Sequence, residues 1–367
     1  MKFIKTIFLS LTLMTIHSSL SLSLNNNQRI PVFLAADDNY APFVATTMAS
    51  ILKNTKSHID FYVLSDGITA KNKAKIANER KWFKNFSLRF IEIDRHRYDD
   101  FFSRKNYYIA KTSYAIIDIP MFGVARNIKK TIYLDDDVIV RGDIKELYDQ
   151  DLGDYVIGAS YDFFHFDSHL QRYIQHFGMS KEHKSLNTGM LLINCDRWRQ
   201  EGITDKLEQV DKDTRYNQNR ILQDQDIFNI LFNNNYKQLD RKFNTAMHYV
   251  NEFLEDKRHD KTLENEMNDS LKRAIIIHYT GKKPWKDNRI LFANEFWKIV
   301  PYTDFADEIK QIHDNSQRDM KIMKNSDKNA AKINKYVRRK VKLVYILFGV
   351  LIGLNIAGLV VFARRRK

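Results

Sequence analysis

Short apolar runs alternate with amphipathic segments through most of the chain. Residues 30–36 (IPVFLAA) form a continuous apolar run, which is typical of a parallel strand buried on both faces. Residues 42–52 then carry apolar side chains at helical spacing. The same patterns predict further strands at 60–64, 88–93, 131–134, 155–160, 191–195 and 274–278, and helices at 69–86 and 225–232. This alternation predicts an α/β fold with a mostly parallel sheet and helices on both of its faces.

Two acidic clusters follow predicted strands. Asp37 and Asp38 come directly after the first apolar run, and the triplet Asp135-Asp136-Asp137 comes directly after residues 131–134. In sheets of this kind, ligands bind beyond the carboxyl ends of the strands. The sequence therefore predicts a ligand site at the edge of the sheet where these acidic residues lie.

Both ends of the chain carry apolar segments. Residues 343–362 are twenty residues without a charge, and a helix of that length, rising about 1.5 Å per residue, would cross a hydrocarbon core about 30 Å thick. Residues 1–24 have the pattern of a signal peptide or signal anchor, with lysines before an apolar stretch. We therefore expect this signal, a folded body at 25–309, a basic stem at 310–342, a transmembrane helix at 343–362 and a basic tail at 363–367.

The positive charge is concentrated at the ends of the chain. The net charge is +14, yet residues 6–309 contain equal numbers of positive and negative side chains. Basic clusters beside apolar segments are typical of a membrane surface, whereas a nucleic-acid-binding body would have a basic excess of its own. We expect a membrane partner and no nucleic acid. The body would be extracytosolic or lumenal if the signal functions, and on the cytosolic face otherwise.

The acidic triplet is a candidate metal site. Like charges in a partly dry crevice repel one another, and a divalent cation between Asp135 and Asp137 would relieve that repulsion. Hard cations of this kind take carboxylate ligands together with diphosphate oxygens. The alternative is a solvated turn in which Asp136 or Asp137 caps the next element. The chain has one cysteine, Cys195, so a Cys-based zinc site and an intrachain disulfide are excluded.

A histidine and a glycine-containing turn end the last predicted strand. His278 is followed by Gly281 and Lys283, and it is a candidate metal or phosphate ligand, with an ordinary core histidine as the alternative. Glycine lets the backbone approach a phosphate closely, and lysine supplies a compact positive charge. These residues predict a binding site for an anionic ligand or a metal at the end of this strand.

Two further polar segments lie next to predicted elements. Asn187 precedes an apolar strand, in a segment that could also be an ordinary turn. Asp224 and Gln225 begin a predicted helix, and Asp224 is either a ligand-binding residue or the N-cap of that helix. Spacing alone leaves both alternatives open.

Five motifs occur in order along the body: AADDNYA, TIYLDDDVIV, LNTGMLLIN, QDQD and HYTGKKPW. Together they resemble glycosyltransferase family 8, which includes bacterial lipooligosaccharide α-galactosyltransferases and glycogenin-like enzymes. The resemblance extends over residues 30–300. It implies a GT-A fold, a bound Mn²⁺ with Mg²⁺ as the alternative, a UDP-sugar donor and retention of configuration at the anomeric carbon.

The resemblance also implies roles for individual residues. Asp135 and Asp137 match the metal-binding D-x-D motif, and His278 matches the third protein ligand. The other matches are Ala35, Asp37 and Asn39 around the base and ribose, Asn187 and Asp224 at the donor sugar, Gln225 near the reacting anomeric carbon, and Gly281 with Lys283 at the diphosphate. Gln225 and Asp224 are therefore the candidate catalytic residues.

One position departs from the family pattern. The family usually has Tyr, any residue and Arg, with Pro four residues after the Arg, whereas this chain has Tyr114-Ala115-Ile116 and then Pro120. Ile116 thus replaces an arginine that helps to bind the donor sugar. We expect a retaining transferase that moves a hexose, galactose or glucose, from a UDP-sugar to a glycan, lipid or protein. The alternative is a catalytically impaired UDP-sugar-binding protein. A haloacid-dehalogenase-type phosphatase also fits residues 135–138, but it would leave AADDNYA and HYTGKKPW without a role.

Overall fold

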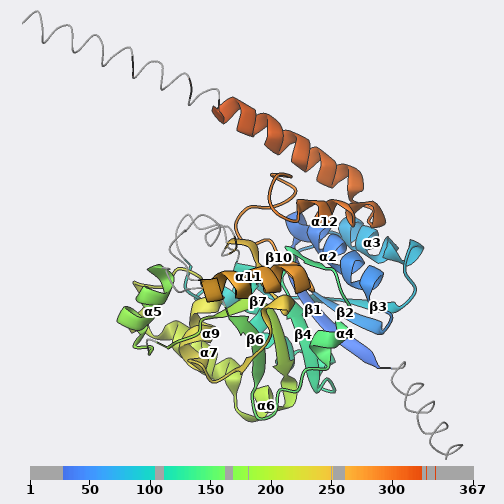
Figure 1. Cartoon of the computed structure of the whole chain (residues 1–367). Helices are drawn as coiled ribbons and strands as arrows, with labels where there is room; N and C mark the ends of the chain where they lie inside the picture. The colour runs from blue at the N-terminus through green and yellow to red at the C-terminus, as the bar shows by residue number, and fades with distance from the viewer. Residues whose placement is uncertain are drawn as a thin grey trace, which may run out of the picture. The chain divides into compact units, whose positions relative to one another are not determined.

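A computed structural model describes residues 28–103, 111–161, 168–180, 182–248, 250, 261–324, 328 and 335. The chain divides into two compact units between Lys310 and Gln311. All the strands that the structure describes belong to the first unit (Figure 1). This unit therefore contains the sheets that position the candidate site.

A seven-stranded sheet forms the centre of the first unit, with the strand order β3-β2-β1-β4-β7-β6-β8 (Figure 1). Its strands are β1 (Arg29–Asp37), β2 (His58–Asp66), β3 (Phe86–Glu92), β4 (Lys130–Leu134), β6 (Ile157–Tyr161), β7 (Leu186–Asn194) and β8 (Lys237–Gln238). Strand β7 runs antiparallel to both of its neighbours, and the other strand pairs are parallel. The expected α/β fold with a mostly parallel sheet is confirmed.

A second, three-stranded sheet has the order β5-β10-β9, with β5 (Val138–Val140), β9 (Thr245–Ala246) and β10 (Ile276–His278). Strand β10 was expected from its apolar residues, but the sequence did not indicate that it lies outside the main sheet. It pairs antiparallel with β5, and His278 is opposite Val138. Because Val138 directly follows Asp137, this register brings the histidine to the acidic triplet.

Helices cover the main sheet on both sides. The α-helices are α2 (Ala41–Asn54), α3 (Ala70–Ala77), α4 (Lys145–Tyr148), α5 (Ser168–Phe177), α6 (Cys195–Gln200), α7 (Ile203–Lys212), α8 (Thr214–Asn217), α9 (Asp224–Phe232), α11 (Lys261–Arg273) and α12 (Ala293–Trp297). The 3-10 helices are η1 (Asp38–Tyr40), η2 (Asn78–Lys81), η3 (Arg95–Tyr98), η4 (Lys111–Met121), η5 (Gly123–Ala125), η6 (Arg241–Phe243) and η7 (Val300–Tyr302). Helix α2 packs on β1, β5 and α3, and α9 packs on β7 and α7 (Figure 1). The helix expected at 69–86 is shorter, because η2 follows α3 and Phe86 already begins β3.

Polar side chains of α2 hold the turn that carries the acidic triplet. The hydroxyl of Thr47 donates to the carbonyl oxygens of Asp136 (3.1 Å) and Val138 (2.9 Å). The side-chain amide of Asn54 donates to the carbonyl oxygen of Val140 (2.9 Å). A buried carbonyl without a partner is costly, so these bonds stabilise the β4–β5 turn against the helix.

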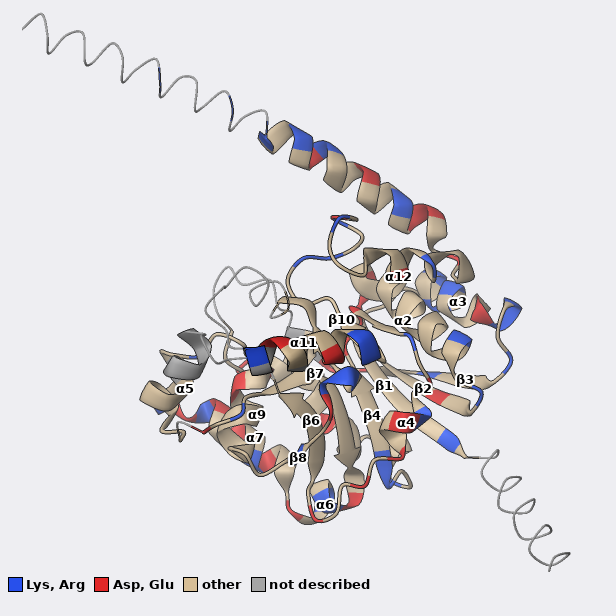
Figure 2. Cartoon of the chain, viewed as in Figure 1, with Lys and Arg blue, Asp and Glu red and all other residues tan. Residues whose placement is uncertain are grey.

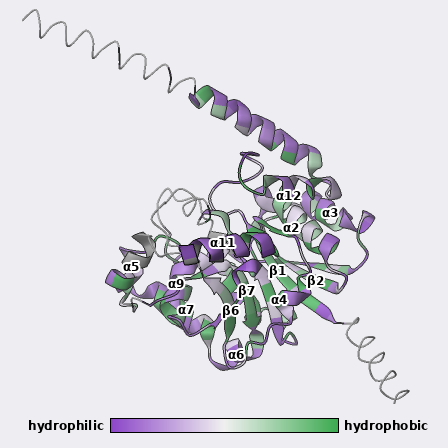
Figure 3. Cartoon of the chain, in the orientation of Figure 1, coloured by the Kyte–Doolittle hydropathy of each residue, from purple (hydrophilic) through white to green (hydrophobic). Residues whose placement is uncertain are grey.

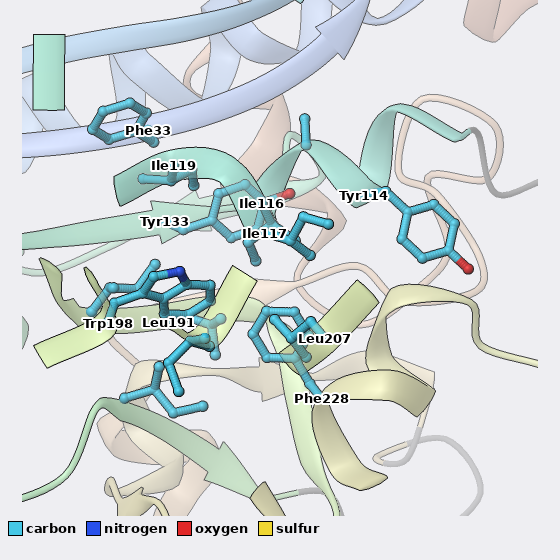
Figure 4. Packing of buried hydrophobic residues seen from close by; sticks show 14 of the residues in the cluster. Phe33, Tyr114, Ile116, Ile117, Ile119, Tyr133, Leu191, Trp198, Leu207 and Phe228 are labelled. Carbon is cyan, nitrogen blue, oxygen red and sulfur yellow. The ribbon is translucent and has the colours of Figure 1, made fainter. Parts of the chain in front are cut away.

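The main hydrophobic core lies between the sheet and the helices of the β7 side. Phe33, Tyr133 and Leu191 of β1, β4 and β7 pack there with Trp198 of α6 and Phe228 of α9 (Figure 4). The hydropathy of the ribbon is highest along the strands and low on surface helices such as α11 (Figure 3). The central strands β1, β2 and β4 were recognisable in the sequence because both of their faces are covered.

The expected transmembrane helix requires a correction. In the part of the chain that the structure describes, no helix is long and apolar enough to cross a membrane. Helices α2 and α11 have 14 and 13 residues, fewer than the ~20 that a span requires, and the helical residues 311–324 carry both basic and acidic side chains (Figure 2). The signal expected at 1–24 and the segments 343–362 and 363–367 lie outside the described residues. The finding for the described residues contradicts the expected membrane localisation.

Candidate donor and metal site

The two outer carboxylates of the triplet lie at the carboxyl end of β4. The phenol of Tyr133 donates a hydrogen bond to Oδ1 of Asp135 (2.8 Å). The backbone N–H of Asp135 donates to the carbonyl oxygen of Gly189 (2.9 Å), and the carbonyl oxygen of Asp137 accepts from the backbone N–H of Tyr279 (2.9 Å). Both ends of the triplet are thus attached to neighbouring backbone, one to β7 and the other to the residue that follows β10.

His278 completes a group of three metal-ligating side chains. Its Nε2 lies 3.0 Å from Oδ1 of Asp137 and 3.6 Å from Oδ2 of Asp135. One ligand atom from each of the three residues lies within 4.8 Å of the others. Two carboxylates and an imidazole form a donor set that suits Mn²⁺ and other divalent cations. The residues that the sequence proposed as metal ligands are brought together, and they fit such an ion.

Gly189 lies against this group and leaves room for no side chain. A Cβ at position 189 would be 2.7 Å from Oδ2 of Asp135 and closer still to Cε1 of His278. Contacts below 3.0 Å essentially never occur for real Cβ atoms. The sequence analysis assigned no role to Gly189, although its place in LNTGM next to Asn187 was the available signal.

Burial and nearby cations act in opposite directions on the three aspartates. Burial opposes the charged form of Asp137, but Lys283 and His278 outweigh it, so its pKa lies well below the ordinary value. Burial raises the pKa of Asp135, and burial together with its two acidic neighbours raises the pKa of Asp136 further. Burial lowers the pKa of His278, but the charge of Asp137, the hydrogen bond to it and the charge of Asp135 together outweigh burial, so the net shift of the pKa is upward. The site concentrates negative charge that a cation would neutralise.

Lys283 is the basic side chain that approaches the triplet from the turn after β10. Its Nζ forms an ion pair with Oδ2 of Asp137 and donates to the carbonyl oxygen of Tyr279 (2.9 Å). Gly281 in the same turn has a φ of 79°, a conformation that glycine adopts without strain. Lys283, one of the residues expected at the diphosphate, therefore places its ammonium group next to the carboxylate of Asp137.

A cavity of about 170 Å³ opens beside the carboxylates. Its lining consists of Ala35, Ala36, Asp37, Tyr40, Thr112, Ser113, Tyr133, Asp135, Asp136, Asp137 and Lys283. Ala35 and Asp37 were expected at the nucleoside, whereas Tyr40, Thr112 and Ser113 were missed by the sequence analysis. Asn39 was expected there as well, but it is exposed, and its amide donates to Oδ2 of Asp37 (3.4 Å).

The expected donor-sugar residues form a buried group on β7 and α9. The side-chain amide of Asn187 donates to Oε1 of Gln225 (3.1 Å), and the hydroxyl of Thr188 donates to Oδ2 of Asp224 (2.9 Å). Gln223 occupies the N-cap position of α9, so Asp224 is not the cap that the alternative interpretation proposed. Burial and the charge of Asp135 raise the pKa of Asp224 to about 7.

The loop before Asp224 holds a strained backbone. Gln223 has a φ of 47°, which is unfavourable for a residue with a side chain. The guanidinium of Arg220 donates to the carbonyl oxygen of Gln223 (3.2 Å) and to the phenol of Tyr114 (2.7 Å), and it pairs with Asp211 (2.7 Å). Such strain persists only when the surroundings enforce it, and it is typical of functional loops.

Ile116, the residue at the family's arginine position, does not face the candidate site. It is fully buried, and it packs with Tyr133, Leu191 and Phe228 in the main core (Figure 4). The apolar replacement is thus accommodated by the core, where Ile116 is fully buried among apolar side chains.

A mostly parallel sheet with an Asp, Asp and His group beyond the end of β4 is the arrangement expected of a GT-A glycosyltransferase. A family model, glycosyl transferase family 8, matches residues 31–289, so the chain belongs to that family. It is 26% identical to General stress protein A of Bacillus subtilis over 73% of this chain and 92% of that protein. It is 23% identical to a lipopolysaccharide 1,2-glucosyltransferase of Escherichia coli over 77% of this chain and 83% of that protein.

Among solved structures, the chain is similar to the galactosyltransferase LgtC, determined with donor and acceptor sugar analogs. The TM-score is 0.63 and the identity 29%, covering 75% of this chain and 96% of LgtC. The resemblance to family 8 is therefore confirmed, and the protein is a hexosyltransferase. The comparisons give no support to the alternative of a catalytically impaired binding protein.

Proposed function

We propose that the protein is a retaining hexosyltransferase that uses a UDP-sugar and a divalent cation, Mn²⁺ or alternatively Mg²⁺. The observation that carries this proposal is the convergence of Asp135, Asp137 and His278, whose ligand atoms lie within 4.8 Å of one another beside the cavity. The family match over residues 31–289 and the unit boundary after Lys310 support residues 25–309 as the transferase domain.

The metal would be held by Asp135, Asp137 and His278. When bound, Mn²⁺ supplies Lewis-acid stabilisation of the charge that develops on the departing diphosphate. Lys283 already lies against Asp137, and its ammonium would bind the diphosphate oxygens directly. The turn at Gly281 would let backbone N–H groups approach the same oxygens. The residues around the leaving group thus balance its negative charge.

The nucleoside would occupy the cavity beside β1. Ala35 and Asp37 line this cavity, and we assign them with Asn39 to the base and ribose. Asp38 is not part of this set, because its carboxylate accepts hydrogen bonds from the backbone of Thr69 (2.7 Å) and the side chain of Asn72 (2.8 Å). Those bonds attach the end of β1 to the start of α3.

The donor sugar would lie against Asn187, Asp224 and Gln225. Asp224 is held by Thr188 and Gln225 by Asn187, so both side chains have defined directions before any ligand binds. Preorganised polar groups of this kind stabilise a developing charge without reorganisation. We assign Gln225 to the reacting anomeric carbon and Asp224 to the positioning of the sugar.

The donor sugar is proposed to be galactose or glucose. The similarity to a galactosyltransferase solved with sugar analogs and to a lipopolysaccharide glucosyltransferase supports a hexose donor. The acceptor is proposed to be a glycan, free or attached to a lipid or protein.

The test is a donor screen with the full chain. UDP release is measured with UDP-galactose and UDP-glucose, with and without Mn²⁺, for the wild type and for Asp135→Ala and Asp137→Ala. We expect release that depends on Mn²⁺ and is lost in both variants, while Asp154→Ala, at a side chain that is 97% exposed, keeps it. Binding of UDP without turnover of any donor would contradict the proposed activity.

A further inference from the structure

Four buried side chains connect the candidate metal group to the residue assigned to the anomeric carbon. Asn187 donates from Nδ2 to Oε1 of Gln225 (3.1 Å), and its Oδ1 accepts from Nδ2 of Asn244 (2.8 Å). Oδ1 of Asn244 lies 3.0 Å from Nδ1 of His278. All four residues are at most 8% exposed. The hydrogen bonds therefore form one continuous chain that is shielded from water.

The backbone of Gly189 determines the direction of every bond in this chain. Its N–H, which can only donate, points to Asn187 at 3.0 Å, so the receiving atom of Asn187 must be its oxygen. The atom of Asn244 that meets the same oxygen must then be its amide nitrogen. The carbonyl oxygen of Asn244 is left to face His278. An amide flip at either asparagine would break a bond to a fixed partner.

This direction determines which nitrogen of His278 carries the retained proton. Nδ1 faces a carbonyl oxygen and must donate, so Nε2 is the nitrogen that faces Asp135 and Asp137. A metal-ligating histidine that donates its other N–H to an oxygen is fixed in tautomer and ring orientation. Gly189 adds a steric restraint, because a Cβ at this position would overlap Cε1 of the His278 ring.

The orientation of the Asn187 amide in turn determines the orientation of the Gln225 amide. Its Oε1 accepts from Nδ2 of Asn187 and from the backbone N–H of Thr188 (3.4 Å). The carbonyl end of the amide is thus held at β7. The side chain enters the site in one orientation that is set by two donors.

We propose that Asn244 is a positioning residue that holds His278 in its metal-binding tautomer and, through Asn187, holds the amide of Gln225 in its reactive orientation. This inference rests on the proposed function. Asn244 lies directly before β9, whose pairing with β10 places it next to His278. The nitrogen of its side-chain amide contacts Asn187 and the oxygen contacts His278, so the two effects are separable by substitution.

The experiment compares three variants of the full chain. Asn244→Ala removes both bonds. Asn244→Asp keeps an oxygen for Nδ1 of His278 but presents an oxygen to Oδ1 of Asn187. Asn187→Asp keeps the bonds to Gly189 and Asn244 but removes the donor to Gln225. Asn294→Asp, at an exposed position, is the matched control. Binding of Mn²⁺ alone is measured from the electron paramagnetic resonance signal of the free ion, together with kcat and KM for UDP-sugar turnover.

We expect Asn244→Ala to weaken Mn²⁺ binding by about 10- to 100-fold. Asn244→Asp should restore Mn²⁺ binding but keep a lowered kcat, and Asn187→Asp should bind Mn²⁺ like the wild type with a lowered kcat. Wild-type Mn²⁺ binding in Asn244→Ala, or equal loss in both Asn244 variants with native circular dichroism, would overturn the inference. A wild-type chain that binds no Mn²⁺ would instead overturn the metal site itself, and the inference with it.

Discussion

Nε2 of His278 lies 3.0 Å from Oδ1 of Asp137. The two residues are brought together by the antiparallel pairing of β5 with β10, in which His278 is opposite Val138. Neither strand belongs to the main sheet. The small sheet therefore assembles the candidate metal group, while the main sheet provides the edge on which it lies.

Gly189→Ala should abolish Mn²⁺ binding while the fold is retained. The added methyl group would meet His278 and Asp135 at distances that require one of them to move, and overpacking of this kind typically costs about 1–3 kcal/mol of stability. Gly123→Ala is the control, because a Cβ there meets nothing within 4 Å. Mn²⁺ titration and urea unfolding check both expectations. An unchanged Mn²⁺ affinity in Gly189→Ala would contradict the tight packing at this position.

Arg220→Met should strongly destabilise the first unit and lower turnover. Arg220 is 2% exposed and pairs with Asp211, which is 4% exposed. Removal of one partner leaves a buried charge uncompensated, at a cost of about 3–5 kcal/mol, and releases the carbonyl of Gln223 next to Asp224. The matched control is Arg215→Met, which breaks the exposed pair with Asp213 and should change urea unfolding little. Equal effects of the two variants would argue against the buried pair.

Asp224→Asn should stabilise the metal-free protein in a manner that depends on pH. Burial and Asp135 raise the folded-state pKa of Asp224 to about 7, above its value in the unfolded chain. Below the unfolded-state pKa the wild type carries no penalty. As pH rises from about 4 to about 7 it progressively loses stability relative to the variant, with each pKa unit corresponding to about 1.4 kcal/mol. Urea unfolding in EDTA across this range measures the difference, and a constant difference would contradict the shifted pKa.

Ile116→Arg, which restores the family's arginine, should destabilise the protein. Ile116 is fully buried among apolar side chains, and an unpaired charge in such surroundings costs several kcal/mol. Ile116→Leu keeps the volume and should cost less than about 1.5 kcal/mol. Thermal unfolding of both variants, with UDP-galactose and UDP-glucose turnover, makes the comparison. A stable, more active Ile116→Arg protein would show that position 116 can reach the donor site.

The local patterns of the sequence determined most of the strands and the family. Strands covered on both faces appear as continuous apolar runs, so β1, β2 and β4 were recognisable from the order of apolar residues along the chain. The triplet at residues 135–137 and the turn around Gly281 were also predicted from local pattern. In the first, three consecutive acidic residues directly follow an apolar run, and in the second a glycine comes shortly after one. The extent of α3 was predicted poorly, since the amphipathic pattern continues past the end of the helix.

Only the tertiary structure decided how these pieces meet. The pairing of β5 with β10, the steric need for Gly189 and the hydrogen bonds of Asn244 all join segments that are far apart in the sequence, and hydrophobic periodicity contains no information about such pairs. The inward direction of Ile116 likewise depends on the core that surrounds it. The sequence by itself therefore predicted candidate residues for the chemistry, and the packing of distant segments decided which of them lie together.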